Sequence, residues 1–190
     1  MAPDDRLVSD QFPRASQYHP EWVLANASGG ANSLWLAEWL APALGLRPGM
    51  RVLDLGCGRA SSSIFLRREF GVQVWAADLW ISAAENSRRI RDAGVEDGVF
   101  PLHADARSLP FAPGFFDAVV AIDSFYYFGS DDLYLNYTRH GENWHVCPEA
   151  TVDATVDSAA HRDAWRGGSN SPTFSRASGP RPGNPFPAWR

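Results

Sequence analysis

The chain has 190 residues, 45% of them hydrophobic, and a formal net charge of −5. This length predicts one domain, and the hydrophobic share suits a globular protein. The acidic balance disfavours nucleic acid as a partner, no apolar run is long enough to span a bilayer, and the polar, acidic N-terminus lacks a secretory signal pattern. We therefore expect a cytoplasmic protein with no nucleic-acid or membrane partner; no oligomeric state is predicted.

The cysteine, lysine and histidine content gives little sign of a disulfide framework, a lysine-based site or a metal site. The two cysteines, Cys57 and Cys147, provide no disulfide framework. The chain has no lysine, which excludes a P-loop lysine and a Schiff-base nucleophile. His140, His145 and His161 are metal-ligating residue types near Cys147, but their spacing matches no recurrent zinc pattern. No metal site is predicted.

Residues 1–48 are predicted to form a helical cap ahead of the first strand. A short helix follows Tyr18 and His19, and apolar residues recur at helical spacing over 31–46. The tryptophans of this region are predicted to pack against the sheet. Tyr18 is the better candidate for a lid over a ligand, because it carries a hydroxyl just ahead of a helix.

A short apolar strand is predicted to end in a glycine-rich turn at residues 52–60. Gly56 and Gly58 let the backbone turn sharply and let a ligand approach the main chain. The carboxylate of Asp54, just before the turn, suits a ligand with a positive end better than a phosphate. The dinucleotide pattern G-x-G-x-x-G is incomplete, because Ser61 stands at the third glycine. An NAD-binding fold remains an alternative.

Two further strands are predicted to lead to acidic residues. A helix over about 61–70 is followed by a strand that ends at Asp78, about 20 positions after the glycine turn. A carboxylate there can accept hydrogen bonds from ribose hydroxyls in either class of fold. A helix over about 82–93 follows, and a third strand at 99–103 leads to Asp105.

Four ordered segments resemble motifs of the class I, Rossmann-like S-adenosylmethionine-dependent methyltransferases. The resemblance covers about residues 15 to 137, and the third small residue of the glycine turn is Ala60 where the family often has glycine. In chain order, the four segments are the turn at 54–60, Asp78, Asp105-Ala106 with Leu109-Pro110-Phe111, and 116–123.

The resemblance implies a cofactor, S-adenosyl-L-methionine, and a place for each part of it. Asp54 and the 56–58 backbone would hold the methionine end, Asp78 the ribose, and Asp105-Ala106 the adenine. The residues implied to bind the cofactor are Asp54, Gly56, Cys57, Gly58, Ala60, Asp78, Leu79, Asp105, Ala106 and Asp123.

The resemblance also implies a fold and a reaction. We expect an α/β, Rossmann-like three-layer α/β/α fold with a mostly parallel sheet, in which residues 49–138 form the cofactor-binding core. The reaction would be in-line transfer of the sulfonium methyl group to a small-molecule acceptor. Positioning of the acceptor would carry much of the catalysis, so no nucleophile is predicted.

The acceptor pocket is predicted at the end of strand four. An acid or a tyrosine beside the acceptor can take its proton. The catalytic residue is therefore unassigned, with Asp123, Tyr126 and Tyr18 as candidates; the other residues expected around the acceptor are His19, Ser124 and Tyr127.

From residue 139 to 190 the composition departs from the family. No leucine follows Leu135 and no isoleucine follows Ile122, so this segment buries too little apolar area to offset its ordering entropy. We expect a low-order tail, with nothing to pair with a weakly alternating stretch at 150–156. The sheet would be incomplete on its C-terminal side, and strand four would have an exposed edge.

A natural disordered tail and a shift of reading frame near Tyr137 both explain this composition, and we favour the shift. Either would make the protein look like a truncated methyltransferase. A protein that binds the cofactor but is inactive is therefore the main alternative function.

Overall fold

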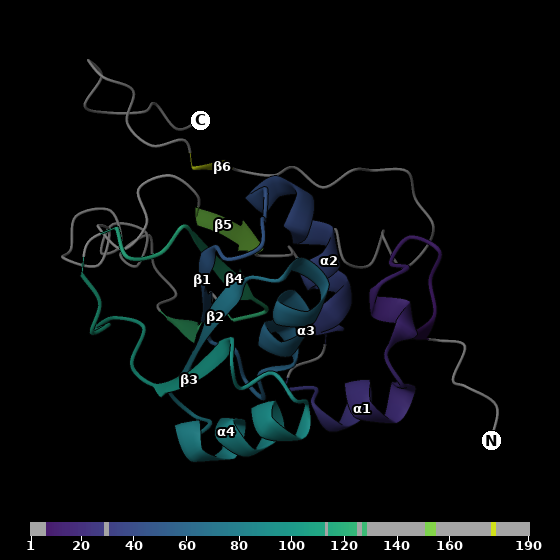
Figure 1. Cartoon of the computed structure of the whole chain (residues 1–190), viewed down its shortest axis with the longest axis horizontal. Helices are drawn as coiled ribbons and strands as arrows, with labels where there is room; N and C mark the ends of the chain where they lie inside the picture. The colour runs from purple at the N-terminus through teal and green to yellow at the C-terminus, as the bar shows by residue number, and fades with distance from the viewer. Residues whose placement is uncertain are drawn as a thin grey trace.

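The computed structural model describes residues 7–28, 31–112, 114–124 and 127–128, together with the backbone of two short strands at 151–154 and 176–177. Figure 1 shows these elements as helices packed against a sheet. In chain order they are α1 (Pro20–Ala25), α2 (Ser33–Leu44), β1 (Arg51–Leu55), α3 (Ser61–Phe70), β2 (Gln73–Asp78), α4 (Ala83–Asp92), β3 (Val99–His103), β4 (Ala118–Ile122), β5 (Thr151–Ala154) and β6 (Arg176–Ala177).

The sheet has the strand order β3-β2-β1-β4-β5-β6. Strands β1 to β5 run parallel to one another, and β6 is antiparallel to β5. The chain first builds outward from β1 through β2 to β3 and then returns to the other side of β1 with β4, so the strand order reverses between β1 and β4. The predicted α/β, Rossmann-like architecture with a mostly parallel sheet is confirmed. Ligands of such open sheets bind beyond the carboxyl ends of the strands at this reversal.

Each face of the sheet has its own apolar core, because successive strand residues point to opposite faces. On one face, Val52 and Val74 belong to a core that includes the buried residues of α2, α3 and α4. On the other face, Leu53 and Leu55 pack with a non-helical aromatic segment around Phe116. Within the described residues, helices therefore cover the first face and the aromatic segment covers the second. In Figure 1, α2 and α3 lie together on one side of the strands.

The edge of the sheet beyond β4 is paired. β5 lies parallel to β4, from the pair Val119–Thr151 to the pair Ile122–Ala154, and β6 adds an antiparallel strand beyond it. The prediction that nothing pairs with the 150–156 stretch, and that strand four has an exposed edge, is therefore wrong. The backbone N–H and C=O groups along the outer edge of β4 pair with those of β5. The rest of the predicted tail, at 139–150, 155–175 and 178–190, lies outside the described residues.

Helix α2 of the N-terminal cap has clear start and stop signals. The Asn32 side chain accepts hydrogen bonds from the N–H groups of Leu34 and Trp35, at 3.1 and 3.3 Å, which is the usual role of an N-cap asparagine. Gly45 ends the helix in the left-handed conformation, with φ of 58°. The helix continues past Pro42 to Leu44, so that proline lies in the last turn. None of the described helices has the length and apolar character needed to cross a membrane.

The turn between β1 and α3 requires left-handed backbone at three positions. Gly56, Gly58 and Ala60 have φ values of 72°, 55° and 59°. The side chain of Ala60 is fully buried, so this residue combines a strained backbone with a packed methyl group. A Cβ on Gly58 would lie 1.9 Å from Ser28 Oγ. The segment ahead of α2 therefore closes directly over the glycine turn.

This close approach predicts a large cost for Gly58→Ala. Gly45 has a similar φ of 58° but no atom within 4 Å of a built Cβ, so Gly45→Ala is a matched control for backbone strain alone. We expect Gly45→Ala to lose about 1–2 kcal/mol of unfolding free energy and Gly58→Ala to lose clearly more, as measured by denaturant unfolding. The excess should disappear in a Ser28→Gly background; equal losses at the two glycines would contradict the contact.

Candidate functional site

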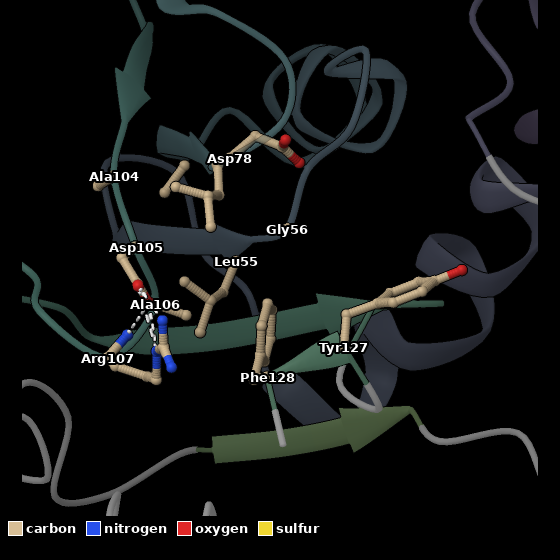
Figure 2. A pocket seen from close by; sticks show the side chains of 11 residues that line it. Leu55, Gly56, Asp78, Ala104, Asp105, Ala106, Arg107, Tyr127 and Phe128 are labelled. Atoms are coloured by element: carbon tan, nitrogen blue, oxygen red, sulfur yellow. Dashed lines mark hydrogen bonds and ion pairs between the residues drawn. The ribbon is translucent and has the colours of Figure 1, made fainter. Parts of the chain in front are cut away.

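A cavity of about 250 Å³ opens beyond the carboxyl ends of the parallel strands. Its walls come from the ends of β1 and β2, the segment after β3 and the segment after β4, as Figure 2 shows. This is the place that the strand-order reversal predicts, and the volume is slightly below the roughly 300–1,000 Å³ of small-molecule sites. Of the residues expected to bind the cofactor, those that line the cavity are Gly56, Asp78, Leu79, Asp105 and Ala106.

Three backbone N–H groups hold Asp78 in place at the cavity wall. Its Oδ2 accepts the N–H of Gly58 at 2.8 Å, and its Oδ1 accepts the N–H groups of Trp80 and Ile81, both at 2.8 Å. The side chain is nearly buried, at 9% exposure. Asp78 therefore joins the glycine turn to the loop that follows β2, a structural role that the sequence analysis did not assign to it.

The N–H groups of the glycine turn all have partners within the chain. Those of Gly56 and Cys57 donate to the carbonyl of Ala77, and that of Ala60 donates to the carbonyl of Cys57. The N–H of Gly58 binds Asp78, and that of Arg59 donates to Ser28 Oγ at 3.4 Å. A pyrophosphate site needs such donors directed at the ligand. This turn does not offer them.

Asp54 lies beneath the turn and does not line the cavity. Its side chain is fully buried, and its Oδ2 accepts the hydroxyls of Ser62 and Ser63, each at 2.6 Å. Its Oδ1 has no partner among the described residues. Burial raises the pKa of the Asp54 carboxyl to about 6, although the two serine hydrogen bonds act in the opposite direction.

The expectation that Asp54 holds the methionine end stays a prediction, and its side chain lies beneath the turn. The reason is strand alternation: Asp54 shares a face of β1 with Val52, and α3 covers that face. Cys57, Gly58, Ala60 and Asp123 also do not line the cavity.

Asn86 is a buried polar residue that the sequence analysis missed. It lies on α4 with 1% exposure, and its Nδ2 donates to the carbonyl of Gly58 at 2.9 Å. The signal for it was present, because Asn86 stands four residues before the apolar Ile90 and so on the same face of the helix. Whereas Ser28 contacts the glycine turn from the segment ahead of α2, Asn86 binds it from α4. Next to it, burial raises the pKa of the Cys57 thiol, which stays protonated and unreactive.

Asp105 is held by Arg107, another residue that the sequence analysis did not single out. The Arg107 Nε donates to both carboxylate oxygens, at 2.9 and 3.1 Å, and the backbone N–H of Arg107 donates to Oδ1 at 2.9 Å. These bonds hold the pKa of the Asp105 carboxyl below its usual value. Figure 2 shows this pair on the wall of the cavity.

The segment after β4 closes the cavity on its remaining side. Ser124 is buried and donates its hydroxyl to the carbonyl of Leu55 at 2.7 Å, which places it against Gly56. Tyr127 and Phe128 line the cavity. Asp123 has a φ of 53°, a left-handed conformation that marks the end of the strand. The candidate Tyr126 lies outside the described residues.

Tyr18 and His19 do not reach the cavity. The Tyr18 hydroxyl donates to Glu69 at 3.0 Å, and its ring contacts Phe65 on α3. Burial raises the pKa of Tyr18 well above its usual value, and the charge of Glu69 adds to this effect. His19 accepts the N–H of Glu21 at 3.3 Å and caps α1. Both residues are used in packing the helical cap, and the expectation that they surround an acceptor stays a prediction.

No three histidine, cysteine, aspartate or glutamate side chains gather as a metal site within the described residues. His140, His145, Cys147 and His161, the ligand types noted in the sequence, all lie outside those residues.

The fold and the site define an α/β protein with a ligand cavity at the strand-order reversal, and comparisons with known proteins show which family it resembles. Residues 52–139 match the family model described as a methyltransferase domain. The 27-O-demethylrifamycin SV methyltransferase of Amycolatopsis mediterranei is 29% identical over 142 residues, or 74% of this chain and 48% of that protein. The ubiquinone/menaquinone biosynthesis C-methyltransferase UbiE of Vibrio campbellii is 37% identical over 95 residues, or 48% of this chain and 36% of that protein.

Among solved structures, the cyclase SpnF is similar with a TM-score of 0.54 and 23% identity, over 62% of this chain and 43% of that one. This likeness is one of fold. Through residues 52–139, the chain is similar to the S-adenosylmethionine-dependent methyltransferases. The chain spans less than half of the length of the two curated relatives described above.

The buried acid predicts an unusual pH dependence of stability. The pKa of Asp54 is about 6 in the folded protein and 3.8 ordinarily, so the folded state binds more protons between these values and stability falls as pH rises from about 4 to about 6. Relative to Asp54→Asn, which does not titrate, the wild type should lose about 3 kcal/mol of unfolding free energy over this window. Denaturant unfolding at pH 4, 5, 6 and 7 measures this difference, and parallel curves for the two proteins would contradict the raised pKa.

Proposed function

We propose that the protein binds S-adenosylmethionine in this cavity and transfers its methyl group to a small-molecule acceptor. The observation that carries the proposal is the position of Asp78 and Asp105. These acids come from the ends of neighbouring strands, and they line one cavity beside the glycine turn of a methyltransferase domain. Their carboxylates suit the hydroxyl and amino donors of a nucleoside.

The residues of the site fit the parts of this cofactor. Asp78 retains acceptor capacity for a ribose hydroxyl, because its two oxygens accept three backbone bonds out of about four positions. Leu79 and Ala106 offer apolar contact to an adenine ring between Asp78 and Asp105. Beneath the turn, Oδ1 of Asp54 has no partner among the described residues, and it is the acceptor that an ammonium group, directly or through a water molecule, would satisfy.

The state of the glycine turn supports this cofactor over NAD. The N–H groups from Gly56 to Ala60 are all used within the chain, and two acids, Asp54 and Asp78, lie next to the turn. A pyrophosphate would meet negative charge and no free donors. A sulfonium cofactor with an ammonium group carries positive charge instead, which the same two acids favour.

When bound, S-adenosylmethionine supplies an activated methyl group on its sulfonium sulfur. The chain's own part is to position the acceptor and exclude water, and the segment after β4 is our candidate for that task because Tyr127 and Phe128 line the cavity. Asp123 and Tyr126 are the candidates for taking the acceptor's proton. We do not retain Tyr18, whose hydroxyl binds Glu69.

The two named relatives support a small molecule as acceptor, since one name contains a rifamycin and the other refers to quinone biosynthesis. The alternative is a protein that binds the cofactor without methyl transfer. It is favoured by a structural neighbour of the same fold that is named a cyclase.

The first experiment is calorimetry of the full chain with S-adenosylhomocysteine, S-adenosylmethionine and NAD. We expect both sulfur ligands to bind and NAD not to bind. Binding of NAD alone would overturn the proposal in favour of a dinucleotide site. Methyl transfer from radiolabelled S-adenosylmethionine to small phenols and quinols then separates an active enzyme from a protein that only binds the cofactor.

Replacing Asp78 should affect both binding and stability. Asp78→Ala removes the acceptor of three backbone N–H groups, so we expect a loss of about 1–3 kcal/mol for each donor left unsatisfied and buried. It should also weaken S-adenosylhomocysteine more than free methionine, since only the former carries a ribose.

Asp117→Ala is the matched control for this prediction. The Asp117 carboxylate accepts the N–H of Arg51 at 2.7 Å, at the start of β1 and away from the cavity. It should lower stability, as seen by thermal unfolding, without changing affinity for S-adenosylhomocysteine. If Asp78→Ala weakened S-adenosylhomocysteine and free methionine equally, Asp78 would have only the structural role of joining the glycine turn to the loop after β2.

A further inference from the structure

The carboxylate expected to meet adenine is already fully engaged within the chain. Oδ1 of Asp105 accepts the backbone N–H and the Nε of Arg107, each at 2.9 Å. Oδ2 accepts Nε at 3.1 Å and Nη2 at 2.5 Å. Figure 2 shows the guanidinium on the carboxylate at the cavity wall. A carboxylate has about four acceptor positions, and residue 107 provides four contacts to this one.

We propose that Arg107 is a displaceable positioning residue of the nucleoside subsite, whose guanidinium occupies the place on Asp105 that the amino group of a bound adenine would take. This inference rests on the proposed function, because it concerns the adenine end of the same cavity. Binding would then exchange one donor for another on Asp105: the guanidinium leaves Oδ2, and the exocyclic amine of adenine replaces it.

The four contacts differ in how easily they can be given up. The Arg107 backbone N–H holds Oδ1 whatever side chain stands at position 107, so the orientation of the carboxylate survives removal of the guanidinium. The ion pair itself is partly exposed, with 32% of the Asp105 side chain and 62% of the Arg107 side chain accessible. Although bidentate geometry makes this ion pair stronger than a single contact, solvent screens an ion pair this exposed. Displacing the guanidinium is therefore inexpensive, and the released side chain can extend into solvent.

The same geometry predicts an effect on base selectivity. Without Arg107, the Asp105 carboxylate can only accept hydrogen bonds. It therefore binds the 6-amino group of adenine and repels the 6-oxo group of hypoxanthine. With Arg107 present, the released guanidinium is a donor close to position 6 of the base, where it partly compensates that repulsion. Arg107 should therefore weaken the binding of adenine and narrow the gap between adenine and hypoxanthine.

The test is calorimetry of the full chain with S-adenosylhomocysteine and S-inosylhomocysteine, for the wild type, Arg107→Ala and Arg107→Lys. We expect Arg107→Ala to bind S-adenosylhomocysteine about two- to fivefold more tightly than the wild type, the range that corresponds to an exposed ion pair. Its preference for adenine over hypoxanthine should rise. Arg107→Lys should lie between the two, because an ammonium cannot engage both oxygens as a fork.

Two controls separate this role from general effects. Arg88→Ala removes one positive charge from the exposed face of α4 and should leave both affinities unchanged. In an Asp105→Asn background, Arg107→Ala should have no further effect, because Arg107 acts through Asp105.

The outcomes distinguish the inference from the proposed function. If the wild type binds neither nucleoside ligand, both are overturned. If the wild type binds S-adenosylhomocysteine and Arg107→Ala binds it equally or more weakly, only the inference is overturned. The same holds if Arg107→Ala strengthens binding to the same extent with Asp105 and with Asn at that position.

Discussion

One buried carboxylate holds the site together. Asp78 accepts N–H groups from Gly58 in the turn after β1 and from Trp80 and Ile81 in the loop after β2. These segments lie about 20 residues apart in sequence, and nothing local fixes their distance. Hydrogen bonds to an ionised acceptor are stronger than those between neutral groups, so one side chain positions both the glycine turn and the loop that carries Leu79.

The turn is held from further directions, and this decides what it can bind. Ser28 contacts Gly58 from the cap, Asn86 binds its carbonyl from α4, and Ala77 accepts the N–H groups of Gly56 and Cys57 from β2. The glycines therefore allow the protein's own segments to approach closely. In many glycine-rich turns, free backbone N–H groups face the ligand. The N–H groups of this turn are used within the chain, so we expect the side chains at the strand ends to recognise the ligand.

The sequence predicted what depends on local pattern. The apolar runs that end in Asp78 and before Asp105 defined the strands, and parallel strands bring their carboxyl ends to one edge. The alternation that hides Asp54 was also readable, since it shares a face with Val52. Other features could not be read in this way. The pairing of β5 with β4 depends on backbone groups distant in sequence. The hydrogen bonds of Tyr18 with Glu69 and of Arg107 with Asp105 depend on side-chain partners that motif spacing does not reveal.

Two acids lie on either side of the glycine turn, and their charges interact. Asp78 binds the turn at Gly58, while Asp54 binds the first residues of α3 through Ser62 and Ser63. Burial raises the pKa of Asp54, and the nearby charge of Asp78 raises it further. In the absence of a cation, ionised Asp54 is costly, because burial and the nearby charge of Asp78 both disfavour its charged form. A positively charged ligand beside the turn relieves that cost, whereas an anion adds to it. The two acids beside the turn therefore favour a positively charged ligand over an anionic one, whatever direct contacts the ligand makes.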